Sequence, residues 1–168
     1  KLMIEAMKDI DANLLIIGEG HLKEDLNRQI ESLGLQKKVF LLGKKKNPYK
    51  YLSYADVFLF TSNYEGFPNV ILEALACHLP IISTDCKSGP REILSPNSDS
   101  KIQLKLGIES EEYGILITQN HIDTLKKSMK ILMKNNELRN DYKSKSKNRV
   151  KDFDVKKIAK KWIVNIDK

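Results

Sequence analysis

The sequence predicts an α/β fold, a Rossmann-like open parallel sheet with helices on both faces and extra helices at the C-terminal end. Short apolar runs alternate along the chain with segments in which apolar residues recur at helical spacing. These runs are continuously apolar, as in parallel strands that are buried on both sides. Because most segments between the runs have room for one helix, successive strands are expected to lie parallel in a single sheet.

In the first half of the chain, glycines mark the ends of several predicted elements. Gly18 and Gly43 each follow an apolar run, and Gly34 stands just after a helical segment, where a left-handed residue commonly ends a helix. We predict helices at residues 2–10, 21–33 and 49–54, and strands at residues 14–17, 39–42 and 57–60.

The second half begins with further strand–helix units and ends in helices. Pro90 suits the first turn of a helix, because the N–H that proline lacks is not needed there. The polar residues 95–112 predict a long surface loop. We predict helices from residue 69 to about residue 77, from residue 90, and at residues 121–135, 137–150 and 155–166, with strands at residues 81–85 and 114–117.

The last predicted helix has one apolar face. We expect Trp162 to anchor this face by packing against the rest of the protein, rather than to serve as a platform for a ligand. The face consists of Val155, Ile158, Ala159, Trp162, Ile163 and Ile166.

Length and composition favour one globular domain in a reducing compartment. The chain has 168 residues, 41% of them apolar, which is enough for a sizeable core. Cys77 and Cys86 are its only cysteines, and it shows neither a signal-peptide pattern nor a membrane-spanning apolar run. We therefore expect a cytoplasmic protein without disulfides. Two cysteines and three histidines are too scattered for us to predict a metal site.

Positive charge is concentrated in the C-terminal quarter. Residues 126–168 contain 15 Lys or Arg and 5 Asp or Glu, whereas residues 1–125 contain 14 and 17. Such a block attracts anionic partners, and a solvated helical face is the simpler interpretation. Few aromatic residues accompany the basic ones, so we do not expect a nucleic-acid partner. Peripheral contact with the anionic inner face of a cell membrane is the alternative.

The segment from Glu65 to Glu73 carries the strongest chemical signal. Its two carboxylates flank a turn, Gly66-Phe67-Pro68-Asn69, which opens an apolar helix. Glycine lets a ligand approach the backbone, asparagine is a preferred N-cap, and the free N–H groups of a helix N-terminus bind anions. The segment therefore predicts a phosphate site beside two acids that accept hydrogen bonds from hydroxyl groups, which suits a nucleotide-sugar.

The chain resembles the C-terminal half of GT-B glycosyltransferases, specifically the retaining family 4 of the group 1 type. The resemblance rests first on residues 62–76, Ser-Asn-Tyr-Glu-Gly-Phe-Pro-Asn-Val-Ile-Leu-Glu-Ala-Leu-Ala. It covers most of residues 2–117 in the order found in the family. The other matching segments are Gly18-Glu19-Gly20, residues 39–43, Ala55-Asp56-Val57, residues 80–85 and Gly89-Pro90-Arg91-Glu92.

The resemblance implies a role for each matching position. Glu65, the expected catalytic residue, corresponds to the acid beside the donor sugar, and Glu73 to the acid that accepts hydrogen bonds from the ribose. The N–H groups of Phe67, Asn69 and Val70 are expected to face the sugar and the diphosphate. The donor-binding residues that the resemblance implies are Gly18, Gly43, Lys44, Lys45, Gly66, Phe67, Pro68, Asn69, Val70 and Glu73.

The resemblance also implies parts that lie outside this chain. In the family, an Arg and a Lys that clamp the diphosphate, the first strand of the domain and the acceptor-binding N-terminal domain all precede the point that matches Lys1. We therefore expect residues 1–168 to be one donor-binding fragment, inactive by itself. The implied donor is a UDP-hexose or UDP-N-acetylhexosamine, and the implied acceptor is a glycan or lipid-linked glycan. No metal or other cofactor is expected, because a helix dipole and cations would balance the diphosphate charge.

Two other functions compete with retaining glycosyl transfer in polysaccharide or glycoconjugate biosynthesis. A nucleotide-sugar 2-epimerase on the same fold would need a histidine–acid pair for proton abstraction, and the sequence offers no convincing pair. A non-catalytic basic binding module is supported only by the C-terminal charge. Arg91 is expected to anchor a loop rather than to touch a ligand.

Overall fold

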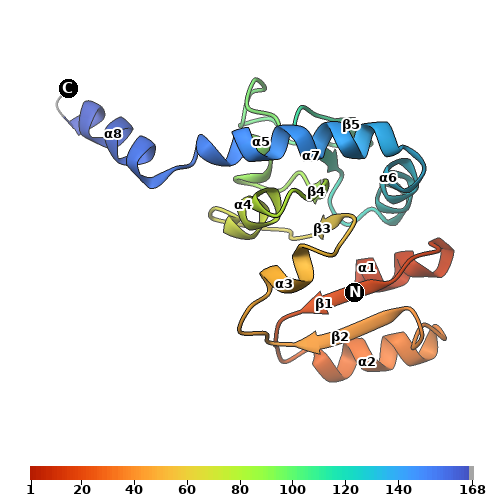
Figure 1. Ribbon diagram of the computed structural model, residues 1–168. Coiled ribbons are helices and arrows are strands. Elements are labelled where there is room, and N and C mark those ends of the chain that lie inside the picture. The colour runs from red at the N-terminus through yellow and green to blue at the C-terminus, as the bar shows by residue number, and fades with distance from the viewer. Residues whose placement is uncertain (167–168) are drawn as a thin grey trace.

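The computed structural model describes residues 1–166, in which helices and strands alternate along most of the chain (Figure 1). The strands form two sheets with the orders β1-β2 and β3-β4-β6-β5. Neighbouring strands are parallel, except that β5 runs antiparallel to β6. The strands are β1 (Leu14–Ile17), β2 (Val39–Gly43), β3 (Phe58–Phe60), β4 (Ile81–Thr84), β5 (Ile108–Ser110) and β6 (Ile115–Ile117).

The helices begin and end at residues suited to those places. Gly34 follows α2 with a φ of 67°, and Pro90 stands in the first turn of α5, both as predicted. The side chains of His121 and Asn135 cap α6 and α7 by accepting backbone N–H groups of the first turns. The helices are α1 (Leu2–Ala6), the 3₁₀ turn η1 (Met7–Asp9), α2 (Lys23–Ser32), α3 (Tyr49–Leu52), α4 (Asn69–Ala76), α5 (Pro90–Leu94), α6 (Ile122–Lys134), α7 (Asn136–Lys151) and α8 (Val155–Ile166).

The predicted fold class is confirmed, and two details of the sheet differ from the prediction. Within the described residues, β1 and β3 exchange no backbone hydrogen bonds, so the strands form two sheets rather than one. Residues 95–112, predicted to be a loop, contain β5, which pairs with β6 along the outer edge of the larger sheet. An antiparallel edge strand on an otherwise parallel sheet is a common arrangement.

Side chains of the N-terminal segment join the two sheets through one hydrophobic core. Ile4, Met7 and Ile10 are at most 1% exposed and belong to the same buried cluster as Leu14 of β1 and Leu125 of α6. Full burial of an aliphatic side chain of this size stabilises a protein by about 1.5–3 kcal/mol relative to exposure. The sheets are therefore held together by packing around α1.

The four-stranded sheet has helices on both faces. In β4, Ile81 packs in a core with α4 and α5, while the next residue, Ile82, packs in the core that contains α6. This is the alternation expected of a strand. All residues of β4 and β6 are buried, as predicted for the central strands of a parallel sheet.

The smaller sheet is covered on one face only. Leu14 and Val39 are register partners in the core, whereas the next pair, Leu15 and Phe40, is 45% and 39% exposed. The prediction that β1 and β2 are buried on both faces is therefore wrong. The reason is that α1 and α2 both pack in the core that holds Leu14 and Val39.

The last helix, α8, leaves the body of the molecule, whereas α7 stays packed on it. α7 runs along the larger sheet, and α8 extends beyond it with no other element beside it (Figure 1). Trp162 is 68% exposed, so the prediction that it anchors α8 against the rest of the protein is wrong for this structure. The side chain of Ile166 lies outside the described part of the chain. No helix in residues 1–166 combines the length and apolar character needed to cross a bilayer.

Tyr142 offers a test of the packing of α7 on the larger sheet. It is 1% exposed, and its hydroxyl donates to the Gly114 carbonyl at 3.2 Å. We expect Tyr142→Phe to lower the free energy of unfolding by about 0.5–1.5 kcal/mol at neutral pH, because it removes this hydrogen bond. The exposed Tyr54 provides a control, since Tyr54→Phe should leave stability unchanged.

The same residue predicts a pH dependence. Burial raises the pKa of Tyr142 to about 12, from about 10 in the unfolded chain. The native state therefore favours the neutral phenol, and the resulting stability is complete below about pH 10 and lost as the pH rises to about 12. Urea unfolding should show a steeper alkaline loss for the unsubstituted protein than for Tyr142→Phe. Parallel pH curves would contradict this assignment.

Candidate functional site

The loops that follow the strands of the larger sheet are tied together at one edge. After β3, the Ser62 carbonyl accepts a hydrogen bond from the Thr84 hydroxyl at the end of β4, at 2.5 Å. The Asn63 carbonyl accepts one from the Gln119 amide after β6, at 2.6 Å. Parallel strands end at a common edge, and in open α/β sheets this edge is where ligands bind. We call this edge of the molecule the rim, and at it the loops after β3, β4 and β6 are connected to one another.

Gly18 and Gly43 lie side by side where β1 and β2 end. The Gly18 N–H donates to the Gly43 carbonyl at 3.1 Å. Their φ angles, 143° and 68°, lie in the region that favours glycine. Apart from the glycine itself and its two neighbours in the chain, no heavy atom lies within 4 Å of the position that a Cβ would take on either residue. The two predicted donor-binding glycines therefore present open backbone, and their contact with a ligand stays a prediction.

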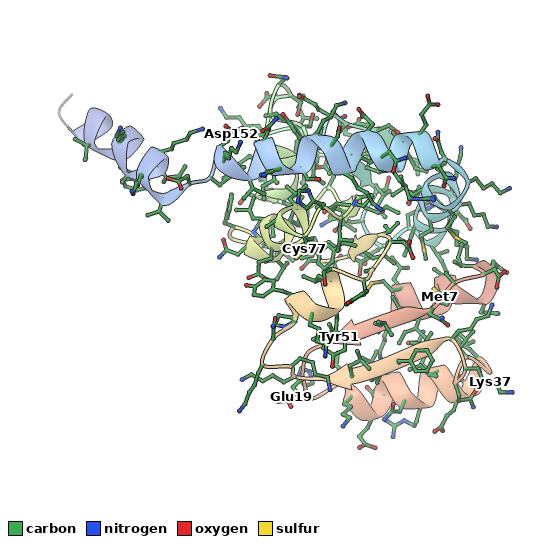
Figure 2. All side chains as sticks on the ribbon, in the orientation of Figure 1. Met7, Glu19, Lys37, Tyr51, Cys77 and Asp152 are labelled. Atoms are coloured by element: carbon green, nitrogen blue, oxygen red, sulfur yellow. The ribbon has the colours of Figure 1, made fainter. Side chains whose placement is uncertain are left out.

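The next two residues place charge near an aromatic ring. Lys44 is exposed, and the Lys45 Nζ lies 5.9 Å from the centre of the Tyr51 ring of α3. Figure 2 shows Tyr51 and Glu19, from the loop after β1, at the same end of the smaller sheet. Cationic and aromatic groups at this end are suitable neighbours for a nucleobase.

The turn before α4 differs in one detail from the sequence prediction. α4 begins at Asn69, Pro68 occupies the N-cap position, and no side chain caps this helix. The Asn69 N–H donates to the Phe67 carbonyl at 3.0 Å, so it is already engaged inside the protein. The prediction that Asn69 is the N-cap is therefore wrong, because its backbone is already inside the helix. Within the described residues, the N–H groups of Phe67 and Val70 have no intramolecular acceptor and suit an anion.

A segment after β4, residues 87–89, holds this turn from the other side. The Glu65 N–H donates to the Lys87 carbonyl, and the Ser88 N–H donates to the Glu65 carbonyl, both at 3.1 Å. The Ser88 hydroxyl also donates to the Gly66 carbonyl at 3.0 Å. We call residues 87–89 the strap. Three hydrogen bonds from the strap fix the backbone on which the predicted catalytic residue, Glu65, is placed.

A buried ion pair supports the strap. The Asp85 carboxylate, 1% exposed, accepts hydrogen bonds from Arg91 Nε at 3.0 Å and Nη2 at 2.5 Å. Arg91 Nη2 also reaches Glu109 of β5 at 2.7 Å, and the Leu104 N–H donates to Asp85 at 2.6 Å. Burial alone would lower the pKa of Arg91, but its bonds to Asp85 and Glu109 more than offset burial and raise it. The expectation that Arg91 anchors a loop agrees with this geometry.

Phe67 is held by the C-terminal part of the chain, a contact that sequence reasoning missed. Its ring centre lies 5.6 Å from that of Phe153, which follows α7. The Arg149 guanidinium lies 4.7 Å from the Phe153 ring centre, and Arg149 Nε donates to the Ile93 carbonyl at 2.8 Å. The residues are more than eighty positions apart in sequence, and no local pattern in the chain indicates the pairing. The end of α7 thus supports the turn before α4.

Glu65 and Glu73 are both partly exposed, so their carboxylates can meet a ligand. Two thiols lie near them. Burial, with a smaller contribution from Glu65, raises the pKa of Cys86, and burial, followed by Glu73, raises the pKa of Cys77. Both thiols are therefore protonated at neutral pH and are poor nucleophiles. The side chains here that are suited to accept hydrogen bonds from the hydroxyl groups of a ligand are therefore the carboxylates of Glu65 and Glu73, not the thiols.

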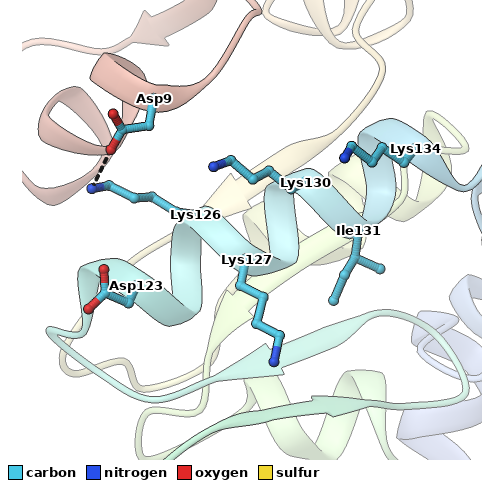
Figure 3. A pocket seen from close by; sticks show the side chains of 7 residues that line it. All are labelled: Asp9, Asp123, Lys126, Lys127, Lys130, Ile131 and Lys134. Atoms are coloured by element: carbon cyan, nitrogen blue, oxygen red, sulfur yellow. Dashed lines mark ion pairs between the residues drawn. The ribbon is translucent and has the colours of Figure 1, made fainter.

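Two surface hollows lie away from the predicted site. One, of about 550 Å³, runs along α6, where Lys126, Lys130 and Lys134 point to the same side and Lys126 Nζ pairs with Asp9 at 2.7 Å (Figure 3). The other, of about 700 Å³, lies between α3 and the end of α4. Neither is lined by a predicted site residue. The predicted site is therefore an open rim of loops rather than either of these hollows.

Comparison with known proteins identifies one family over most of the chain. Residues 1–149 match the family described as glycosyl transferases group 1. An uncharacterized glycosyltransferase of Methanocaldococcus jannaschii is 40% identical over 172 aligned residues, which cover 94% of this chain and 42% of that protein.

A second relative and a solved structure agree with this match. The N-acetylgalactosamine-N,N'-diacetylbacillosaminyl-diphospho-undecaprenol 4-alpha-N-acetylgalactosaminyltransferase of Campylobacter jejuni is 39% identical, over 89% of this chain and 37% of its own length. A crystal structure of Staphylococcus aureus TarM with fondaparinux, alpha-GlcNAc-glycerol and UDP superposes with a TM-score of 0.82 at 26% identity. That superposition covers 96% of this chain and 31% of TarM. The chain thus spans less than half the length of these relatives.

Gly89 provides a test of the contact between the strap and the turn. A Cβ at this position would lie 2.3 Å from Pro68 Cδ, and the φ of Gly89 is 102°. We expect Gly89→Ala to lower the free energy of unfolding by about 1–3 kcal/mol, measured by urea denaturation. The control is Gly20→Ala, since Gly20 has no atom within 4 Å of the Cβ position. Equal stability of the two variants would show that the strap does not pack tightly on Pro68.

Proposed function

This chain belongs to the family of group 1 glycosyl transferases, and we propose that it is the donor-binding half of such an enzyme. The observation that carries the proposal is the segment from Glu65 to Glu73. It places two partly exposed carboxylates and the unengaged N–H groups of Phe67 and Val70 on the rim where the strands end. These are the groups that sugar hydroxyls and a diphosphate require.

We assign the two acids different roles. Glu65 lies in the turn that the strap holds, and we propose that it contacts the hydroxyl groups of the donor sugar and fixes the reacting geometry. Glu73 lies about one turn inside α4. A carboxylate there can accept hydrogen bonds from the ribose without lying against the diphosphate. Gly18, Gly43, Lys44 and Lys45 would contact the nucleoside.

The proposed donor is a UDP-sugar, a UDP-hexose or UDP-N-acetylhexosamine. The TarM structure, part of which matches the fold of this chain, contains UDP. In the proposed reaction, the bond from the anomeric carbon to the diphosphate oxygen breaks, and an acceptor hydroxyl oxygen bonds to the same face of that carbon. The acceptor proton leaves with the UDP oxygen. The N–H groups at the start of α4 would stabilise the charge that develops on the diphosphate, without a metal.

The proposed acceptor is a glycan or lipid-linked glycan in surface polysaccharide or glycoconjugate synthesis. The Campylobacter relative supports this class, because its name describes transfer to a diphospho-undecaprenol-linked saccharide. That protein is more than twice as long as its match to this chain, and we propose that acceptor binding and the diphosphate clamp belong to sequence outside residues 1–168. The unpaired Cys77 and Cys86 support a cytoplasmic site of action.

Calorimetric titration with UDP and UDP-sugars tests donor binding. We expect saturable binding, with UDP, UDP-hexose and UDP-N-acetylhexosamine competing for one site. Circular dichroism of the same sample must show the folded protein. Absence of binding at millimolar ligand by a folded protein would overturn the proposal.

The division of roles between the acids can be tested with paired variants. We expect Glu73→Ala to weaken UDP binding roughly 10- to 100-fold, because hydrogen bonds to a charged group contribute about 1.5–3 kcal/mol. Glu65→Ala should leave UDP affinity nearly unchanged and reduce the additional affinity for the UDP-sugar. Each variant acts as the control for the other. Equal UDP affinities of the two variants would contradict the assigned roles.

A further inference from the structure

The strap is the middle of a short loop that one ion pair closes. Asp85 stands at the start of this loop, directly after β4, and Arg91 stands at its end, in the first turn of α5. The two side chains are only 1% and 7% exposed. Their hydrogen bonds, from Arg91 Nε at 3.0 Å and Nη2 at 2.5 Å, use two nitrogens of one rigid guanidinium. The pair therefore fixes both the distance and the direction between the two ends of the loop.

Two further segments are bonded to the pair. In the loop before β5, the Leu104 N–H donates to the Asp85 carboxylate at 2.6 Å, and the Gln103 amide donates to the Asp85 carbonyl at 3.1 Å. In β5 itself, Glu109 accepts a hydrogen bond from Arg91 Nη2 at 2.7 Å. The ends of the strap are thus tied to each other and to the outer edge of the larger sheet.

The strap transmits this constraint to Glu65 rather than to Glu73. Its hydrogen bonds reach the backbone of Glu65 and Gly66. Gly89 lies so close to the turn that a Cβ on it would be 2.3 Å from Pro68 Cδ. Within residues 1–166, no hydrogen bond joins the strap to α4, the helix that carries Glu73. A displaced strap is therefore expected to move Glu65 more than Glu73.

Stability alone is a poor account of the buried pair. Two charges that leave water lose their hydration, and apolar side chains of similar volume often stabilise a core equally well. Such side chains are at hand, because Ile93 and Leu94 of α5 are fully buried in an apolar cluster. What the ion pair adds is a single preferred geometry. A fixed geometry suits a segment that has to place a carboxylate.

We propose that Asp85 and Arg91 are positioning residues for the donor sugar. By closing the strap they set the place of Glu65, and so the affinity for the sugar part of the donor, separately from the affinity for its nucleotide. Both side chains are buried, so they act through Glu65 and not by touching the donor. This inference deepens the proposed function and rests on it, since it requires Glu65 to meet the sugar of a nucleotide-sugar.

Two changes loosen the strap without leaving a buried charge unpaired. Asp85→Asn combined with Arg91→Met removes both members of the pair, whereas either change alone would leave its partner buried and unpaired. Ser88→Ala removes only the hydroxyl that donates to the Gly66 carbonyl at 3.0 Å. Ser88 is exposed, so this second variant keeps the test valid if the double variant does not fold.

Each change has a matched control in α7. Tyr142→Phe removes a buried hydrogen bond that does not involve the strap. Ser144→Ala removes an exposed hydroxyl that donates to the Asp141 carbonyl at 2.8 Å. The controls separate displacement of the strap from a general loss of stability.

Hydrogen exchange followed by NMR reports on the strap without any ligand. The N–H groups of Glu65 and Ser88 both bond between the strap and the turn at 3.1 Å. In the double variant their exchange should accelerate roughly 10-fold relative to that of Leu116 in the buried strand β6, and by a smaller factor in Ser88→Ala. Both controls should leave this relative rate unchanged.

Calorimetric titration of the same samples measures the effect on the donor. The ligands are UDP and whichever of UDP-glucose and UDP-N-acetylglucosamine binds the unsubstituted chain more tightly. We define the selectivity as the Kd for UDP divided by the Kd for the UDP-sugar. It should fall roughly 10-fold in the double variant and about 2- to 5-fold in Ser88→Ala, while the Kd for UDP changes less than about threefold. Both controls should keep the selectivity of the unsubstituted chain.

The outcomes distinguish this inference from the proposed function. Unchanged selectivity in both strap variants, with UDP still bound, would overturn the inference and leave the proposed function standing. So would unchanged exchange at Glu65 and Ser88, or an equal loss of selectivity in the α7 controls. If the folded, unsubstituted chain binds no UDP, the proposed function fails, and the inference fails with it.

Discussion

The buried pair of Asp85 and Arg91 is the constraint on which the candidate site depends. A charge that is removed from water is costly unless it is paired and hydrogen-bonded, and here Asp85 receives hydrogen bonds from both Arg91 and the Leu104 backbone. The pair fixes the end of β4 relative to α5, and Glu109 extends it to β5. The strap begins two residues after Asp85, which itself follows the last residue of β4. Its position over the turn before α4 is therefore set by an interaction beneath the rim.

Packing around α1 determines which surfaces remain open. The buried side chains of α1 and η1 join the smaller sheet to α6 and so hold the two sheets in one body. They occupy one face of β1 and β2 and leave Leu15 and Phe40 on the other. The glycines that end these strands are also open, because no side chain approaches them. The core thus buries one face of β1 and β2, while their carboxyl ends, where a ligand would bind, stay accessible.

The sequence identifies those parts of the fold that follow from local pattern. The apolar run that ends before Gly18 predicts β1, and the helical spacing of apolar residues predicts α8. The Gly-Phe-Pro-Asn turn and Pro90 mark the starts of α4 and α5. The family resemblance rests on residues 62–76. β5 could not be predicted, because Ile108-Glu109-Ser110 has no strand pattern and is fixed by pairing with β6 and by the bond from Arg91 to Glu109. The contact of Phe67 with Phe153 depends on where α7 ends, and no local signal encodes that. Trp162 was expected to be covered because its face is apolar, yet no element of the described chain reaches it.

The most informative departure from the sequence prediction is the arrangement at the end of α7. Arg149 donates to the Ile93 carbonyl of α5 and lies over the ring of Phe153, which in turn packs on Phe67. One arginine therefore connects α5, the end of α7 and the turn that presents the unengaged N–H groups. α5 also contains Arg91, whose ion pair with Asp85 supports the strap. The strap and Phe153, which both contact the turn before α4, are therefore both anchored to this one short helix. The sequence of the turn supplies the residues expected to meet the donor. Their positions, however, depend on two contacts with distant parts of the chain, the strap and Phe153.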